Sequence, residues 1–289
     1  MVEGKTWEDA TSRWFKERSH KASLFSDRSI IKWLNSHLSG RLLVHIDRHL
    51  IAELRCRKIA AGVKNSTVNR MLALLRSLLN TAVKEWGWID ESPFVKLLPE
   101  PKRRIRFLTR TEAILLLSEL PNHLSDMAAF SLATGLRRAN VTGLEWSQVD
   151  LKRRLAWIHP DQAKSGHAIP VPLNRDAIIV LHKWLNIHSK FVFCYQGRQI
   201  AQTSTAAWYK ALRRCRIRDF KWHDLRHTWA SWHVQSGTPL HVLQELGGWQ
   251  TYEMVQRYAH FSAGDLALYV DRVPPLALES CHVLQSSPT

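Results

Sequence analysis

The 289-residue sequence contains little cysteine and has no long apolar run. Its cysteines are scattered, with neither a C-x-x-C pair nor a disulfide-dense spacing, which predicts free thiols in a reducing compartment. No apolar run approaches the ~20 residues needed to span a bilayer, and the first ten residues are acidic and polar rather than signal-like. The sequence therefore predicts a cytoplasmic protein without a membrane partner. The four cysteines are Cys56, Cys194, Cys215 and Cys281.

Three motifs that mark common enzyme classes are also absent. There is no G-x-x-x-x-G-K-[ST] loop for nucleotide hydrolysis and no G-x-G-x-x-G fingerprint for a dinucleotide. A G-x-S-x-G nucleophile elbow is missing too, so an α/β-hydrolase site is not expected.

Positive charge, by contrast, is abundant. Lys and Arg outnumber Asp and Glu by 41 to 25, for a formal net charge of +16 and a pI near 10.1. Such an excess favours a polyanionic partner, because neutralising phosphates releases condensed counterions. With a hydrophobic fraction of 45% and 13 Trp, the chain can build packed cores and bind nucleic acid as a folded protein.

A proline-rich basic stretch divides the chain. Pro93, Pro99 and Pro101 are followed by the run Lys102–Arg106, a sequence poor for helix and suited to an extended linker. We therefore expect a helical DNA-binding domain at 1–100, a basic linker at 101–107, a second domain at 108–270 and a C-terminal tail at 271–289.

The first domain is expected to be helical, because apolar residues recur at three-to-four spacing in four segments. The fourth segment is the clearest, and Ser66 or Asn65 could cap its start. Arg70, Arg76 and Lys84 are interspersed there, which favours a solvated face and a phosphate-tracking face about equally. The expected helices are Trp7–His20, Phe25–Leu38, Ile46–Gly62 and Ser66–Trp86.

The second domain mixes helices with short strands, which predicts a mainly α protein with a small antiparallel β-sheet, an α+β fold. Thr109 and Glu112 form a capping-box signature at its start. Strands are expected at Trp146–Val149, Arg154–Ile158 and Ala168–Pro172. Helices are expected at Glu112–Leu120, Asp126–Ala133, Asp176–His188, Thr205–Arg214, His223–Ser236, Leu240–Gly247 and Tyr252–His260.

Several side chains in this second domain are suited to phosphate chemistry. Gly135 is typical of a helix end, and Arg137 just after it could present a bidentate fork to phosphate oxygens. His223 and Arg226 are three residues apart, so they share a helical face and can reach one phosphate. Lys164 falls in the expected turn between two strands, a position suited to delivering a proton.

A zinc site is the alternative interpretation of one of these segments. His223 and His227 are spaced i, i+4, as in H-E-x-x-H zinc sites. Asp224, however, is shorter than the glutamate that positions water in such sites, and Arg226 would bring a cation beside the metal. These two residues make phosphate binding the better interpretation.

Taken together, the set resembles the tyrosine recombinase (lambda-type phage integrase) family. That family has an arginine after T-G-x, a lysine in a β-hairpin, an H-x-x-R, a second His or Trp, and a tyrosine nine residues later. The resemblance covers about 120 residues in order, and the helical first domain also resembles the family's core-binding domain. The matching residues are Arg137, Lys164, His223, Arg226, Trp249 and Tyr258.

The resemblance implies site-specific recombination of DNA through a 3′-phosphotyrosine, with no cofactor and no metal. Tyr258 would be the nucleophile, and Arg137 and Arg226 would bind the non-bridging phosphate oxygens. His223 would accept the tyrosine proton or orient the phosphate, and Lys164 would protonate the leaving 5′ oxygen. The ring of Trp249 would wall the site and its N–H could reach a phosphate oxygen; His227 is expected to pack or hydrogen-bond within the site rather than to react.

Taken one at a time, these residues have simpler interpretations. Tyr258 alone would more often be a half-buried core tyrosine, Trp249 alone is more typical of packing, and a turn lysine such as Lys164 is usually just solvated. The ordered set, rather than any single member, supports the family resemblance.

The sequence departs from the family pattern in two places. Asn140 stands where the family usually has an acidic residue three positions after the first arginine, which removes a charge that would orient Arg137. The usual L-G-H-x-S is replaced by Leu246–Gln250, in which Trp249 is an accepted substitute. The N-terminal arm-binding domain of many phage integrases is expected to be missing.

The expected partner is double-stranded DNA with a specific recombination site, at the nucleoid. A homotetramer on DNA, exchange of C-terminal segments and accessory bending or directionality factors are implied by the resemblance. A type IB topoisomerase-like activity and a DNA-binding prophage remnant without strong catalysis are the alternatives to a recombinase.

Overall fold

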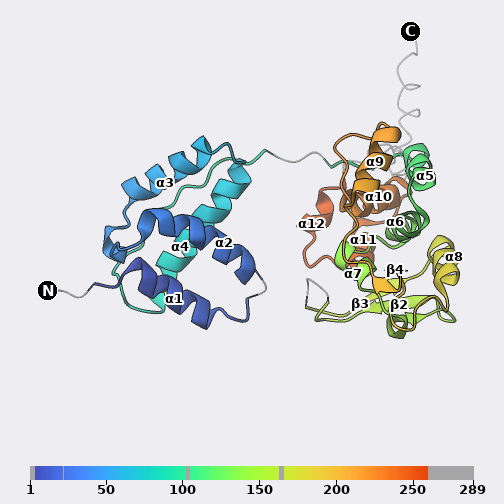
Figure 1. The fold of residues 1–289 in the computed structure, drawn as a ribbon, viewed down its shortest axis with the longest axis horizontal. Helices are drawn as coiled ribbons and strands as arrows, with labels where there is room; N and C mark the ends of the chain where they lie inside the picture. Colours follow the sequence, from blue (N-terminus) through green and yellow to red (C-terminus); the bar gives the residue numbers. More distant parts are fainter. Residues whose placement is uncertain (1–3, 22, 102–104, 163–165, 260–289) are drawn as a thin grey trace, which may run out of the picture. The chain divides into compact units, whose positions relative to one another are not determined.

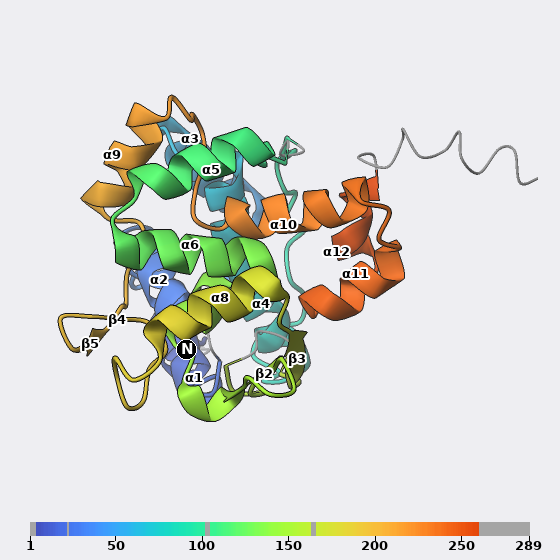
Figure 2. The same ribbon diagram turned by 90° about the vertical axis from the view of Figure 1, so that its right-hand side faces the viewer.

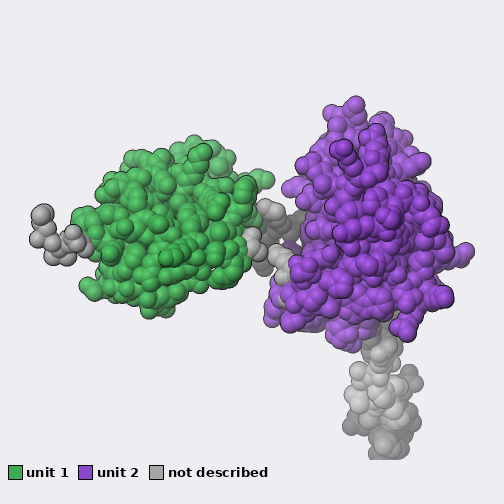
Figure 3. All heavy atoms as spheres, turned by 60° about the horizontal axis from the view of Figure 1, so that its bottom comes forward, with its two compact units in different colours: residues 1–103 green, residues 104–289 purple. Residues whose placement is uncertain are grey.

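The computed structural model describes residues 4–21, 23–101, 105–162 and 166–259. The chain divides into two compact units, residues 1–103 and residues 104–289, which Figure 3 shows in separate colours. The division falls inside the stretch 101–107 that the sequence marks as a linker. Ile105 and Arg106 nevertheless pack on the second unit, where Arg106 Nη2 lies 2.7 Å from Glu112 Oε1.

The described part of the first unit consists of helices around a single apolar core (Figure 1). Helix α4 lies along this core and buries an almost continuous apolar face, as its three-to-four spacing predicts. Its start differs from the expectation, because Lys64 occupies the N-cap position without a side-chain cap. Asn65 instead donates to the carbonyl of Pro99 over 2.8 Å. The helices are α1 (Trp7–Glu17), α2 (Leu24–Leu38), η1 (Leu43–His45), α3 (Arg48–Ala60) and α4 (Asn65–Lys84).

In the second unit, helix α6 lies at the centre and packs against α5, α8 and α10 (Figure 2). The capping box at the start of α5 is confirmed: Glu112 N–H donates to Thr109 Oγ1, and Thr109 N–H donates to Glu112 Oε2. The helices are α5 (Arg110–Glu119), α6 (Asn122–Thr134), α7 (Arg138–Thr142), η2 (Trp146–Gln148), α8 (Arg175–Trp184), α9 (Ala206–Arg214), α10 (Asp224–Gln235), α11 (Leu240–Gly247) and α12 (Glu253–Gln256).

Short antiparallel strands complete this unit. Strands β1 (Val149–Asp150), β2 (Leu155–Ile158) and β3 (Ile169–Pro172) form one sheet in that order, with Ile158 opposite Ile169. Strands β4 (Cys194–Tyr195) and β5 (Arg198–Gln199) form a second, two-stranded sheet. Buried residues alternate with partly exposed ones in β2 and with exposed ones in β3. One face of the first sheet therefore packs against the core.

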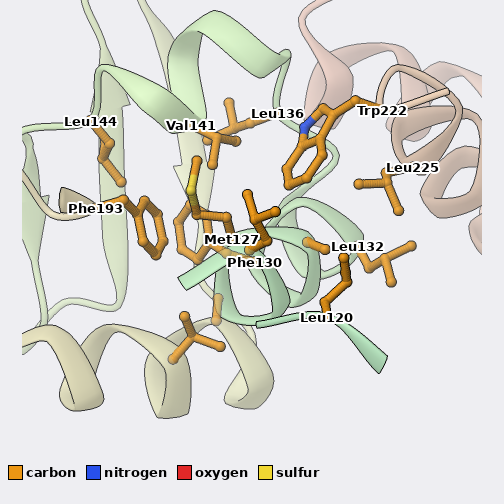
Figure 4. Close-up of a cluster of buried hydrophobic side chains, with 14 of the residues drawn as sticks. Leu120, Met127, Phe130, Leu132, Leu136, Val141, Leu144, Phe193, Trp222 and Leu225 are labelled. Carbon is orange, nitrogen blue, oxygen red and sulfur yellow. The ribbon is translucent and has the colours of Figure 1, made fainter. Parts of the chain in front are cut away.

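Helix α6 supplies the centre of the main core of the second unit. Figure 4 shows its Met127 and Phe130 among side chains from several other segments, with Phe193 beside them. The rings of Phe130 and Phe193 meet edge to face, with centroids 5.4 Å apart. A smaller apolar cluster joins α10, α11 and α12, and it contains Trp229 and Tyr258. This second cluster carries the candidate site.

Some expected elements differ from the observed ones. The prediction of a strand at Trp146–Val149 is wrong for the first three residues, which form the 3-10 helix η2. Tertiary bonds override the strand propensity there: Trp146 N–H donates to Lys190 O, and the Gln148 amide donates to Trp157 O. Helix α8 ends at Trp184 rather than at His188, and α7, β4 and β5 were not expected at all.

This arrangement of helices with small antiparallel sheets confirms the α+β fold class. Among the described residues, no helix is both long and apolar enough to cross a bilayer. The tail expected at 271–289 lies outside the described residues.

Candidate active site

The end of α6 brings the first arginine into the site. Gly135 caps this helix in the left-handed conformation, with φ of +65°. A Cβ there would lie 2.2 Å from Cε3 of Trp229, so both the backbone angle and the space require glycine. The chain then turns, and Arg137 becomes the N-cap residue of α7. Burial lowers the pKa of Arg137, whose half-buried side chain lines the site pocket.

Arg226 on α10 is fixed by two carbonyl groups that lie far from it in the sequence. Its Nη1 donates to Gly135 O over 2.7 Å, and its Nη2 donates to Gly247 O over 2.6 Å. Both carbonyls lie at helix C-termini, where the helix dipole attracts a cation. A guanidinium has five N–H donors, so three remain for another ligand. Arg226 is thus oriented before any substrate arrives.

Trp249 covers this guanidinium. The centroid of its ring lies 4.1 Å from Arg226 Cζ, and the ring also stacks against Trp229 with a centroid separation of 6.0 Å. A Cβ on Gly247 would lie 1.9 Å from the Trp249 ring, so the ring occupies the space that glycine leaves open. Trp249 therefore lines the pocket and packs over the guanidinium of Arg226.

Tyr258 lies in the turn that follows α12. The helix expected to run to His260 ends at Gln256, because Tyr258 N–H donates to Val255 O in a tighter i−3 turn. This turn places the side chain in the cluster around Trp229, where only 1% of it is exposed. The phenol oxygen lies 2.5 Å from Nδ1 of His227.

The site is rich in arginine, and two of its side chains, Arg226 and Tyr258, are buried. Burial, and then the charge of Arg137, lowers the pKa of Arg226 to about 9, so the guanidinium still carries its charge at neutral pH. Burial raises the pKa of Tyr258 to about 12, with Arg226 and Arg257 opposing that rise. The phenol is therefore protonated at neutral pH.

His223 and His227 differ in their surroundings. His223 is the N-cap residue of α10, is exposed, and lines the pocket, and its ring makes no hydrogen bond to a described residue. This ring meets that of His227 edge to face, with centroids 5.0 Å apart. The pocket partly desolvates both rings, which lowers the pKa of each, and positively charged neighbours add to this effect; the pKa of His227 falls to about 4.

One pocket of about 200 Å³ collects five of the six residues singled out in the sequence. The sixth, Lys164, lies in the connection between β2 and β3 and outside the described residues. The family pattern gives no role to Arg257, although this residue immediately precedes Tyr258, and the sequence predicts only a supporting role for His227. The pocket is lined by Arg137, His223, Arg226, His227, Trp249, Gln250, Met254, Arg257 and Tyr258.

Asn140 is buried on α7, one turn after Arg137. Within the described part of the chain its Nδ2 has no hydrogen-bond partner. The zinc alternative gains nothing from the geometry: Nδ1 of His227 is engaged by Tyr258, and the described residues contain no group of three potential ligands.

Comparison with known proteins places this site in a family. Residues 106–264 match the phage integrase family. The chain is 38% identical to the integrase of Salmonella phage P22, over 93% of this chain and 79% of that protein. The fold matches the Tn1549 transposon integrase in complex with a circular-intermediate DNA, with a TM-score of 0.77, 16% identity, and coverage of 91% of this chain and 99% of that one.

Lambda integrase has the same fold. Its dimer bound to a core site matches with a TM-score of 0.72 and 20% identity, over 88% of this chain and 95% of that one, and it has also been solved as a tetramer on a Holliday junction. The chain therefore belongs to the phage integrase family of tyrosine recombinases, whose activity is site-specific DNA recombination. Neither the topoisomerase-like alternative nor the inactive remnant is favoured by any of these matches.

Proposed function

We propose that this recombinase cleaves DNA by attack of Tyr258 on a backbone phosphate, which leaves a 3′-phosphotyrosine and a free 5′ hydroxyl. The observation that carries the proposal is the single pocket in which Tyr258 meets arginines, two histidines and Trp249. Because the phosphotyrosine retains the energy of the broken bond, the 5′ hydroxyl can reverse the step without ATP.

Arg137 and Arg226 would bind the non-bridging oxygens of the phosphate. Arg226 has three N–H groups left after its bonds to Gly135 and Gly247, and both arginines line the pocket. As the pentavalent transition state gains negative charge, the two guanidinium groups would stabilise it, and Arg226, held by its two carbonyls, would do so without reorganising. His223 and Arg257, which are exposed and line the same pocket, would add further donors.

Lys164 would protonate the leaving 5′ oxygen. The proposal rests on its position in the connection between β2 and β3 and on the family pattern, in which a hairpin lysine precedes the H-x-x-R. An unperturbed lysine ammonium has a proton to give at neutral pH, and the leaving alkoxide needs one.

The first unit would hold the DNA. Arg70, Arg76 and Lys84 are exposed on α4, and the chain as a whole carries a charge of +16. Four protomers would assemble on two recombination sites, as in lambda integrase, which has been solved as a tetramer on a Holliday junction. We also propose that accessory factors, which bend the DNA or set the direction of recombination, take part in this assembly.

A nicked suicide duplex tests the cleavage step. The core site would first be selected by binding of the full chain to a random duplex pool, and the nick would be placed near the cleavage position. The wild-type chain should form a covalent adduct, and Tyr258→Phe should form none. Tyr252→Phe is the matched control, because this tyrosine is 43% exposed and lies outside the pocket. No adduct with wild type, or an unchanged adduct with Tyr258→Phe, would refute the proposal.

A further inference from the structure

The shortest polar contact of the nucleophile is with a histidine that the family pattern leaves without a catalytic role. His227 projects from α10, and its Nδ1 lies 2.5 Å from the hydroxyl oxygen of Tyr258. The two ring centroids are 5.8 Å apart, so the contact is made through these two atoms rather than by stacking. No other hydrogen bond of the Tyr258 hydroxyl is found among the described residues.

We propose that His227, rather than His223, accepts the proton of Tyr258 during DNA cleavage. This inference rests on the proposed function of Tyr258. As the phenol oxygen forms its bond to phosphorus, its proton passes to Nδ1 of His227, and the bond from phosphorus to the 5′ oxygen breaks. The leaving oxygen takes a proton from the general acid. In religation the proton returns from His227 to the phenol, so the protein ends as it began.

The surroundings of His227 keep its ring neutral and ready to accept. Burial and its positive neighbours depress the pKa of the imidazole, so one nitrogen is free of a proton at neutral pH. In the reactive tautomer the ring proton is on Nε2 and the lone pair of Nδ1 faces the phenol. The charged and titratable groups that share its pocket are Arg137, His223, Arg226, Arg257 and Tyr258.

DNA supplies the missing driving force. In the free protein the phenol is a weak acid and His227 a weak base, so transfer between them is unfavourable. A phosphodiester seated between Arg137, Arg226 and Arg257 brings a negative charge into this pocket, which favours the imidazolium and offsets the repulsion from the arginines. Proton transfer is thereby coupled to correct seating of the phosphate.

His223 is differently placed. It is exposed and makes no bond to Tyr258; His227 contacts the phenol, and His223 meets His227 edge to face. Its position in the pocket lining suits a donor to a phosphate oxygen. The two histidines therefore have different roles. His223 would donate to the phosphate, and His227 would bond the phenol of Tyr258 and accept its proton.

Substitution of His227 by two residues separates proton transfer from positioning. His227→Asn puts an amide oxygen near the place of Nδ1, which can still accept the phenol hydrogen bond but cannot take the proton. His227→Ala removes both. We expect adduct formation on the nicked duplex to slow by about 10²–10³-fold in both variants, with DNA affinity and the melting transition of His227→Asn at neutral pH close to wild type. His241→Asn, an exposed histidine on α11, should react at the wild-type rate.

Two further measurements report on the proton itself. The wild-type cleavage rate should fall at acid pH as His227 becomes protonated, and this limb should vanish in His227→Asn. Replacing Tyr258 by a fluorotyrosine, whose phenol is more acidic, should raise the cleavage rate of His227→Asn by about tenfold. Less proton transfer is then needed in the transition state. A 5′-bridging phosphorothiolate should not rescue this variant, because its better leaving group relieves only the need for a general acid.

The outcomes distinguish this inference from the proposed function. If Tyr258→Phe forms the adduct as wild type does, Tyr258 is not the nucleophile, and both the proposed function and this inference are refuted. If wild type and Tyr258→Phe behave as expected but His227→Asn keeps the wild-type rate and acid limb, His227 only positions the tyrosine and the inference fails. Rescue of His227→Asn by the phosphorothiolate would likewise overturn it.

Discussion

Arg226 donates a hydrogen bond of 2.7 Å to the carbonyl of Gly135, a residue 91 positions earlier in the chain. The contact joins the body of α10 to the C-terminal end of α6, just before the turn that carries Arg137. The other branch of the same guanidinium donates to the carbonyl of Gly247, at the end of α11 and just before Trp249. A single buried side chain therefore sets the spacing between the two arginines and the tryptophan of the site.

Replacing Gly135 by alanine should destabilise the second unit strongly. The residue has a φ of +65°, and its new Cβ would lie 2.2 Å from the ring of Trp229. Left-handed strain costs roughly 1–2 kcal/mol and overpacking roughly 1–3 kcal/mol more. Urea unfolding followed by tryptophan fluorescence measures the loss. Gly237→Ala is the control, because Gly237 has a φ of +79° with nothing within 4 Å of a Cβ, and it should show the strain alone. Equal losses in the two variants would contradict the clash.

Arg137→Lys should lower the rate of adduct formation by about 10²–10³-fold, because a point charge cannot replace a bidentate fork at the phosphate. Folding should be little affected, since the side chain is only half buried. Single-turnover cleavage of the nicked duplex measures the effect. The neighbouring Arg138 is exposed and outside the pocket, so Arg138→Lys should stay within about twofold of wild type. Similar rates for both variants would remove Arg137 from the site.

Much of this site could be predicted from the sequence because its members keep fixed spacings along the chain. The helix end at Gly135 was evident from one residue, and His223 and Arg226 were placed together by helical periodicity. The contact between His227 and Tyr258 could not be predicted, because it depends on how the turn after α12 packs against α10. The 3-10 helix at Trp146–Gln148 escaped prediction for the same reason: its bonds come from residues distant in sequence.

Acid should destabilise the wild-type protein partly through His227. Burial lowers the pKa of this ring to about 4 from an ordinary value of 6.5, so the folded state binds its proton less readily than the unfolded state. The corresponding stability is present above pH 6.5 and is lost as the pH falls toward 4, by on the order of 3 kcal/mol. Over this window, the free energy of unfolding of wild type should fall relative to that of His227→Asn, as measured by urea unfolding at several pH values. A difference between the two proteins that is constant with pH would contradict the shift.

Asn140→Asp should speed cleavage. Asn140 is buried one turn after Arg137, and its Nδ2 has no partner among the described residues. A carboxylate there would attract the Arg137 guanidinium and hold it toward the phosphate, and a charge-assisted contact worth about 1 kcal/mol in the transition state gives about a fivefold faster rate. Single-turnover cleavage of the nicked duplex measures the gain, and Asn140→Leu, which has the same branching of side-chain heavy atoms but no polar ones, is the control that should give none. If Asn140→Asp reacts more slowly than wild type, the cost of burying the carboxylate exceeds its attraction to Arg137, and the amide is the better partner for this site.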